Sequence, residues 1–358
     1  MWKYLVGGIV LLQFARGPAG AVQNAPPHAA TPVDPIAAVV EAFRTHNIVT
    51  LTDPHGNVQV QAFLLSLVRD PRFPDAANDI VIETASARYQ DAIDRFIRGD
   101  DVEPGVLRRA WEDHTVANSL GVQAEELIRA VRTVNASLSE PRRLRVVDGD
   151  PPIDWDNIAS SQDHTRWIEL RDSYPADLIR RQVLDRARRA LVVYGQGHLQ
   201  RRQIVANYDM SSWQAQTVVS LLERDHAARI FNIWTLQSRS VELPEGTQSW
   251  RVPSLALLRG TTLGASDFGV YDRGLGDGSR FGVKAGQLVP IPREEWKVMR
   301  MEEQFDALLY LGPPASMTMT SVPASLCSDA DFVKRRIDRL TRFGPPVEVQ
   351  NFRKACGL

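Results

Sequence analysis

Short apolar runs alternate with amphipathic stretches along most of the chain. Four runs, at residues 48–51, 79–83, 144–147 and 190–194, have the length and β-branched content of strands buried on both faces. The segments between them carry apolar residues at helical spacing, as in 58–69. This alternation predicts an α/β protein with a mainly parallel central sheet, right-handed crossovers and helices on both faces.

The same pattern predicts the remaining elements. Expected helices run from Asp34–Pro35 to about His46, between residues 86 and 140 with breaks at Gly99 and Gly105, and over 162–189, 211–224 and 329–342. Two later strands are expected at 229–236 and 305–311, and a loop at 72–74. Residues 237–290 hold most of the later glycines and are interpreted as an insertion or lid region within a single domain, 34–358.

The N-terminus has the features of an export signal. A cationic start, an apolar run at 4–14 and an Ala-Gly-Ala triplet predict a signal peptide over 1–21, followed by a flexible, proline-rich leader over 22–33. An uncleaved membrane anchor is the alternative, but the run is shorter than the roughly 20 residues that a membrane span needs. We therefore expect a secreted or periplasmic protein with no stable membrane span after cleavage.

Composition narrows the class of protein further. With a net charge of −1, the chain lacks the excess of basic residues that is typical of nucleic-acid-binding proteins. The two cysteines, Cys327 and Cys356, are expected to form a disulfide in an oxidising compartment, with two separate buried thiols as the alternative. Neither cysteine has the surroundings of a nucleophile, which excludes cysteine catalysis.

Polar side chains stand where predicted strands end. Asp53 and His55 follow the first strand, Glu83 ends the second with Arg88 close behind, and His198 follows the glycines of the Tyr-Gly-Gln-Gly-His segment at 194–198. Because the carboxyl ends of parallel strands meet at one edge of a sheet, we expect His55, Glu83 and His198 to share a crevice. There they would bind a Zn, Mn or Fe ion, or act without metal as general base and supporting carboxylate.

Further polar residues are assigned by position. Asp148 and Asp150 leave the third strand, and we expect Arg88 and Asp150 to contact substrate. The structural alternatives are an ion pair between Glu83 and Arg88 and a turn-forming role for Asp150. Histidines in charge-rich helical surroundings are predicted to be solvated, with His164 the best candidate among them for the site; they are His46, His114, His164 and His226.

The sequence lacks the motifs of several enzyme classes. The chain has no Gly-x-Ser-x-Gly elbow, no Walker-type phosphate loop and no His-Glu-x-x-His helix. The glycine pair at 195 and 197 lacks the third glycine of a dinucleotide-binding fingerprint.

Three motifs in order resemble one superfamily. The Gly-Gln-Gly-His element at 195–198 is similar to the Gly-x-x-His element of the superfamily that joins erythromycin esterase, the Tiki and TraB proteins and the ChaN haem-uptake proteins. The Leu-Thr-Asp-Pro-His-Gly segment at 51–56 resembles its first Gly-Glu-x-His-Gly motif, with Thr52 and Asp53 in place of the usual glycine and glutamate. The strand-borne glutamate between them matches Glu83.

The resemblance implies an α/β fold with a site lined by His55, Glu83 and His198. The superfamily contains metal-dependent peptidases, metal-free ester hydrolases and haem binders. We therefore expect a hydrolase that acts on an ester or amide of a small molecule or peptide. The alternatives are a haem- or metal-binding uptake protein without catalysis, and a structural sheet protein whose polar groups satisfy one another.

Overall fold

The computed structural model describes residues 26–117, 121–201, 216–236, 243, 246–271, 280–284, 287–292 and 298–358. The predicted signal peptide, the start of the leader and most of the glycine-rich segment at 271–278 lie outside these residues. Within them, no helix is both long enough and apolar enough to cross a membrane.

An eight-stranded sheet forms the centre of the described chain, in the order β1-β7-β10-β6-β2-β5-β3-β4. The strands from β10 to β4 pair in parallel, and β7 pairs antiparallel with both β10 and β1. The strands are β1 (Pro32–Val33), β2 (Ile48–Thr52), β3 (Asp79–Ser86), β4 (Arg145–Asp150), β5 (Ala190–Tyr194), β6 (Ile230–Thr235), β7 (Ser254–Leu257) and β10 (Ala307–Tyr310), with a separate hairpin of β8 (Arg280–Lys284) and β9 (Gln287–Ile291).

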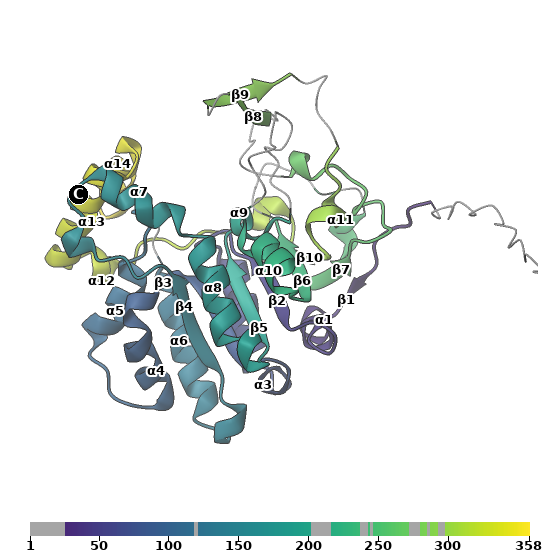
Figure 1. Cartoon of the computed structure of the whole chain (residues 1–358), viewed down its shortest axis with the longest axis horizontal. Helices are drawn as coiled ribbons and strands as arrows, with labels where there is room; N and C mark the ends of the chain where they lie inside the picture. The colour runs from purple at the N-terminus through teal and green to yellow at the C-terminus, as the bar shows by residue number, and fades with distance from the viewer. Residues whose placement is uncertain are drawn as a thin grey trace, which may run out of the picture.

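Helices surround the sheet, as Figure 1 shows. They are α1 (Pro35–Ala42), α2 (Val58–Arg69), α3 (Phe73–Ala76), α4 (Gln90–Arg98), α5 (Pro104–Glu112), α6 (Val122–Asn135), α7 (Ser161–Glu169), α8 (Ser173–Gln182), α9 (Gln196–Leu199), α10 (Val218–His226), α11 (Met301–Gln304), α12 (Ala324–Cys327), α13 (Ala330–Phe343) and α14 (Pro346–Ala355).

The sheet has a hydrophobic core on each face. Successive side chains of a strand point to opposite faces, so Leu191 and Val193 of β5 pack with α2, α4 and α6, whereas Val192 and Tyr194 pack with α8 and α10. Every residue of β5 is buried, as expected for a parallel strand covered on both sides. The predicted α/β class, with a mainly parallel sheet between two helical layers, is confirmed.

Three expectations about single elements were wrong. The long helix predicted over 162–189 is broken into α7 and α8, because Pro175 cannot donate a backbone hydrogen bond and is accommodated in the first turn of α8. The loop expected at 72–74 runs into the short helix α3, and Gly105 lies within the first turn of α5 rather than at a break.

Two segments expected outside the core belong to the sheet. The leader contributes β1, where Pro32 is tolerated because the strand lies at an edge. The glycine-rich region contributes β7, whose Leu255 and Ala256 are fully buried between β1 and β10. A four-residue strand is too short to give a clear periodic signal, so the sequence pattern does not distinguish β7 from the predicted insertion around it.

Candidate functional site

The strand order creates a crevice at the carboxyl ends of β2, β5 and β3. The chain passes from β2 to β3, and β5 later fills the position between them. After β2 the chain forms α2, which packs on one face of the sheet. The next long helix after β5 among the described residues is α10, which packs on the other face. Neighbouring strands that lead to opposite faces leave an opening between their ends, the usual ligand position in open α/β sheets.

Three side chains expected to converge lie together at this opening. His55 Nε2 is 3.4 Å from Glu83 Oε2, and His198 Nε2 is 3.5 Å from Glu83 Oε1. Glu83 is therefore held between the two imidazoles. The structure brings these three predicted residues together.

Local backbone features explain the position of Glu83. The pairing of β3 with β4 shifts register between Ile82 and Ser86, and the pairing with β5 ends at Ile82. Such irregularities redirect side chains near active sites. The carboxylate of Glu83 accepts a hydrogen bond of 2.5 Å from the backbone N–H of Gly195.

Gly195 is required by close contact at this point. A Cβ at this position would lie 3.2 Å from both Glu83 Oε2 and His55 Nε2. Any side chain would therefore crowd the carboxylate and the imidazole. This glycine of the recognised motif keeps the space beside His55 open.

His55 is held by its own loop. Its backbone adopts the left-handed conformation, with φ of 40°, which is uncommon for a residue with a side chain. Asp53 stabilises this turn, because its carboxylate accepts from the backbone N–H of His55 at 3.0 Å and from its Nδ1 at 3.1 Å. The side chain of His55 remains 36% exposed, whereas Glu83 is 3% exposed.

The charges fix the protonation of the pair. Burial alone lowers the pKa of His55, but the carboxylates of Glu83 and Asp53 outweigh it and raise this pKa well above its ordinary value. Burial alone raises the pKa of Glu83, but His55, His198 and Arg171 together hold it well below its usual range. The raised pKa of His55 and the lowered pKa of Glu83 both favour an imidazolium next to a carboxylate.

Two consecutive residues that the sequence analysis missed complete the site. In the turn between α7 and α8, Arg171 donates to Glu83 Oε1, and Asp172 Oδ1 lies 2.8 Å from His198 Nδ1. Asp172 also accepts from the first backbone N–H of α10, at Val218. Both residues fell inside the long helix predicted at 162–189, and Pro175 was the available sign that this helix is interrupted.

The other predicted site residues lie elsewhere. The arginine that pairs with Glu83 is Arg171, whereas Arg88 forms an ion pair of 2.9 Å with Asp154. The alternative pair of Glu83 with Arg88 is therefore wrong. Asp150 is 1% exposed and accepts from the backbone N–H and hydroxyl of Thr115 at 2.8 and 2.6 Å, so it lies behind the opening.

A buried polar cluster adjoins the site through Arg171. Arg171 Nε lies 3.9 Å from Asp150 Oδ1, and His114 Nε2 lies 3.4 Å from the same oxygen. His114 is 2% exposed, which contradicts the expectation that it is solvated, and burial lowers its pKa to about 3. Burial raises the pKa of Asp150 well above its usual range. His164 lies next to this cluster, with Nε2 2.7 Å from the carbonyl oxygen of Thr115.

The predicted metal ion does not fit the three residues as they are arranged. Both oxygens of Glu83 are engaged, one by Arg171 and the other by the N–H of Gly195. A cationic guanidinium therefore competes with a metal ion for one of these oxygens. Over the described ranges, no three His, Cys, Asp or Glu side chains are grouped so that they could hold a metal.

His55 is also poorly arranged to ligate haem iron. An axial imidazole must offer an unprotonated nitrogen, whereas both ring nitrogens of His55 face carboxylates and its pKa is raised.

A cleft of about 690 Å³ opens onto His55. Asp53, His55, Gly56 and Gly195 contribute to its lining, together with residues of α13 and α14. This volume is in the range of sites that bind small molecules.

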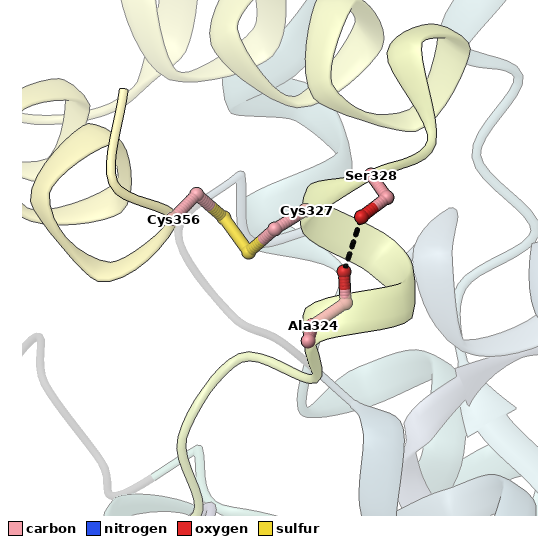
Figure 2. Close-up of a disulfide and its surroundings, with 4 residues drawn as sticks. All are labelled: Ala324, Cys327, Ser328 and Cys356. Carbon is pink, nitrogen blue, oxygen red and sulfur yellow. Dashed lines mark hydrogen bonds between the residues drawn. A yellow bond between two sulfur atoms is a disulfide. The ribbon is translucent and has the colours of Figure 1, made fainter.

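The disulfide lies in the C-terminal segment that forms this lining. We call residues 319–356, which include α12, α13 and α14, the C-terminal cap; in Figure 1 its helices gather beside α7. Cys327 at the end of α12 is bonded to Cys356 at the end of α14, with their Cα atoms 5.2 Å apart (Figure 2). The predicted disulfide is confirmed.

Comparison with known proteins bears on the fold. No protein-family model and no curated protein sequence matches the chain. Among solved structures, a succinoglycan biosynthesis protein is 11% identical with a TM-score of 0.51, over 79% of this chain and 94% of that one. This likeness shows that the two chains share an α/β fold.

Two further solved structures are similar to the chain with lower TM-scores. A Bacillus cereus protein is 10% identical with a TM-score of 0.43, covering 78% of this chain and 94% of its own. ChaN of Campylobacter jejuni, solved with cofacial haem, is 10% identical with a TM-score of 0.37, covering 57% of this chain and 86% of its own. At these identities the likeness concerns the fold alone.

Proposed function

We propose that the protein is an exported hydrolase, secreted or periplasmic, that cleaves an ester or amide of a small molecule or peptide without a metal ion. The observation that carries this proposal is the Asp53–His55–Glu83 arrangement at a cleft of small-molecule size. A histidine oriented by a carboxylate and open to a cleft is the usual form of a general base.

His55 accepts the proton of the attacking water. Asp53 holds Nδ1, so Nε2 is the nitrogen that receives the proton. The space next to Nε2 is kept open by Gly195, which itself lines the cleft. The two carboxylates stabilise the imidazolium that forms, as the aspartate does in a Ser-His-Asp triad.

Glu83, His198 and Arg171 supply the charges around this base. Glu83 stays ionised because His55, His198 and Arg171 hold its pKa low. Its Oε2, 3.4 Å from His55 Nε2, orients the water next to His55. Arg171 places a positive charge beside the carboxylate, and this charge offsets the negative charge that develops on the acyl oxygen. The imidazole of His198 lies on the same carboxylate and can donate a hydrogen bond there.

A substrate panel tests this proposal. Nitrophenyl esters of increasing acyl length and fluorogenic peptide amides are incubated with the purified protein, with and without a chelator. We expect ester or amide hydrolysis that the chelator does not reduce. Chelator-sensitive hydrolysis would overturn the metal-free chemistry, and a Soret shift on haemin titration without any hydrolysis would favour the binding protein.

Two variants assign the activity to this site. His55→Ala and His198→Ala are expected to abolish turnover while thermal unfolding and circular dichroism stay close to those of the parent. Full activity in both variants would refute the proposed site.

A further inference from the structure

Met319, the first residue of the C-terminal cap, lies against the loop that carries His55. It forms an antiparallel bridge with Asn57. The backbone N–H of the next residue, Thr320, donates to the carbonyl oxygen of Gly56 at 2.7 Å. Backbone pairing therefore fixes the position of Met319 next to the histidine, although the two residues are far apart in the sequence.

Side-chain hydrogen bonds on both sides of Met319 strengthen this attachment. The hydroxyl of Thr318 accepts from Gln59 Nε2 at 2.9 Å, and the backbone N–H of Thr318 donates to Gln59 Oε1 at 3.0 Å. The hydroxyl of Thr320 accepts from Gln123 Nε2 at 2.8 Å. The polar neighbours of Met319 are thus joined to α2 and α6, and Met319 is the apolar side chain between them.

The side chain of Met319 reaches the part of the cleft beside His55. Met319 lines the cleft and is 50% exposed. A Cβ placed on Gly56, which also lines the cleft, would lie 3.5 Å from the methyl carbon Cε of Met319. This methyl group therefore lies next to the residue that follows His55. An unbranched thioether side chain adapts its shape to an apolar ligand.

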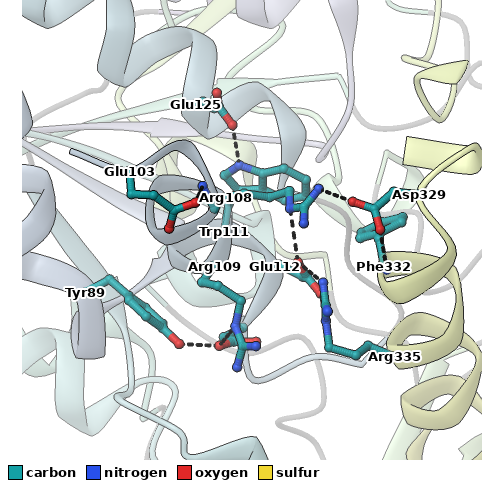
Figure 3. A network of polar contacts seen from close by, with 12 residues as sticks. Tyr89, Glu103, Arg108, Arg109, Trp111, Glu112, Glu125, Asp329, Phe332 and Arg335 are labelled. Atoms are coloured by element: carbon teal, nitrogen blue, oxygen red, sulfur yellow. Dashed lines mark hydrogen bonds and ion pairs between the residues drawn. The ribbon is translucent and has the colours of Figure 1, made fainter. Parts of the chain in front are cut away.

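Ion pairs hold the helices of the cap against the body of the protein. Arg108 Nη1 lies 2.6 Å from Asp329 Oδ2, and Arg335 Nε lies 2.7 Å from Glu112 Oε1 (Figure 3). These contacts join α13 and its N-cap to α5. The lining that α13 supplies is therefore fixed relative to the rest of the protein, as Met319 is by its backbone pairing.

Most other side chains of this lining are apolar. Arg336 and Glu348 are charges of opposite sign, so the cap side of the cleft carries no net charge. A hydrocarbon group that displaces water from this cleft covers Met319, which is favourable in proportion to the apolar area removed from water. The apolar residues that line the cleft with Met319 are Val116, Val122, Val322, Leu340, Phe352 and Ala355.

We propose that Met319 is a specificity-determining residue that contacts an uncharged hydrocarbon group of the substrate next to the bond that reacts. The inference rests on the proposed function only for the reaction itself, which is placed at His55. The contact with Met319 is a binding property, so it is measured without turnover.

Nuclear magnetic resonance of the full-length protein with isotope-labelled methionine methyl groups tests the contact. The probes N-methylhexanamide and N-methylacetamide share one amide group and differ in chain length. We expect the longer probe to shift the methyl signal of Met319, assigned with Met319→Leu, and not that of the fully buried Met301. It should bind about tenfold more tightly than the shorter probe, because its chain covers more apolar area. An unshifted Met319 signal, or equal affinities, would overturn the proposal.

Substitutions assign the chain-length preference to one side chain. Met319→Gln keeps a side chain of similar length but makes it polar, and is expected to remove the preference. Met319→Leu stays apolar and should retain most of it. Val347→Gln is the matched control, because Val347 is an apolar residue of α14 that is 54% exposed and does not line the cleft, so no change is expected.

The outcomes separate this inference from the hydrolase proposal. A shifted Met319 signal with a chain-length preference that Met319→Gln abolishes supports the inference even when no ester is hydrolysed. Hydrolysis whose kcat/KM is independent of acyl length, together with an unshifted Met319 signal, overturns the inference and leaves the hydrolase proposal intact. If Met319→Gln does not fold, as seen by circular dichroism, the Met319 signal of the parent protein decides: a shift with the longer probe supports the proposal, and no shift refutes it.

Discussion

Different interactions position the C-terminal cap and the polar centre, which is the group of His55, Glu83 and His198 at the strand ends. At the centre, each key group follows or belongs to a buried parallel strand, so the backbone ladder of the sheet sets its position. The cap lies beyond the strands, and ion pairs to α5 and a disulfide hold it in place. Both regions nevertheless line one cleft.

This difference assigns separate tasks to the two regions. Backbone hydrogen bonds within a sheet place side chains precisely enough for proton transfer, because neighbouring strands move little relative to each other. Side-chain ion pairs and a covalent link hold a wall that can vary in sequence without disturbing the sheet. Damage to the centre should therefore reduce turnover, and damage to the cap should mainly change substrate affinity.

Among the charged groups around the two histidines, the largest effect is expected for Glu83. Glu83→Gln keeps the size of the side chain but removes the charge between the two imidazoles, so kcat should fall on the order of 10³-fold. Its control is Asp150→Asn, which alters a buried carboxylate that does not line the cleft. Equal losses of kcat in Glu83→Gln and Asp150→Asn would contradict a role in turnover that is specific to Glu83.

The next effect concerns Arg171. Arg171→Met leaves Glu83 with one cation fewer, so kcat should fall about 100-fold and the free energy of unfolding by about 3 kcal/mol. Arg171→Lys should recover part of both losses because it restores the charge. Steady-state kinetics and urea denaturation measure the two quantities, and unchanged kcat in Arg171→Met would contradict the electrostatic role.

A smaller effect is expected from Asp53, and it appears in the pH profile. His55 acts as a base only when neutral, and its pKa is raised, so activity should increase with pH above its ordinary value of 6.5 and level off in the alkaline range. Asp53→Asn should move this midpoint to lower pH and reduce the plateau by about tenfold. A profile whose activity falls over that pH range would instead assign His55 the role of an acid.

The smallest effect on turnover is expected from the cap. Replacing both cysteines by serine opens a link between residues separated by 29 positions and should cost about 3 kcal/mol of stability. KM should rise a few-fold because the cleft wall is less well held, while kcat stays nearly constant. A large fall in kcat at unchanged KM would show that the cap acts on the chemistry itself.

Much of the candidate site could be predicted from local sequence. His55, Glu83 and His198 stand at the ends of buried runs, and parallel strands present those ends at one edge. Arg171 and Asp172 could not be found this way, since they lie in a turn whose contacts depend on how α7 and α8 cross the sheet. Arg88 is expected at the site from its closeness to Glu83 in sequence, whereas proximity in space decides an ion pair and selects Arg171.

The sequence by itself determined the α/β class, the strands of the parallel sheet and the glycine-supported histidine at its edge, because periodicity and chain order carry that information locally. Only the tertiary structure decided which charged side chains contact Glu83. It also decided that Asp150 lies behind the opening and that the C-terminal cap lines the cleft. The physical reason is that strand pairing depends on repeated local patterns, whereas ion pairs and cleft walls depend on single side chains brought together over long separations in the chain.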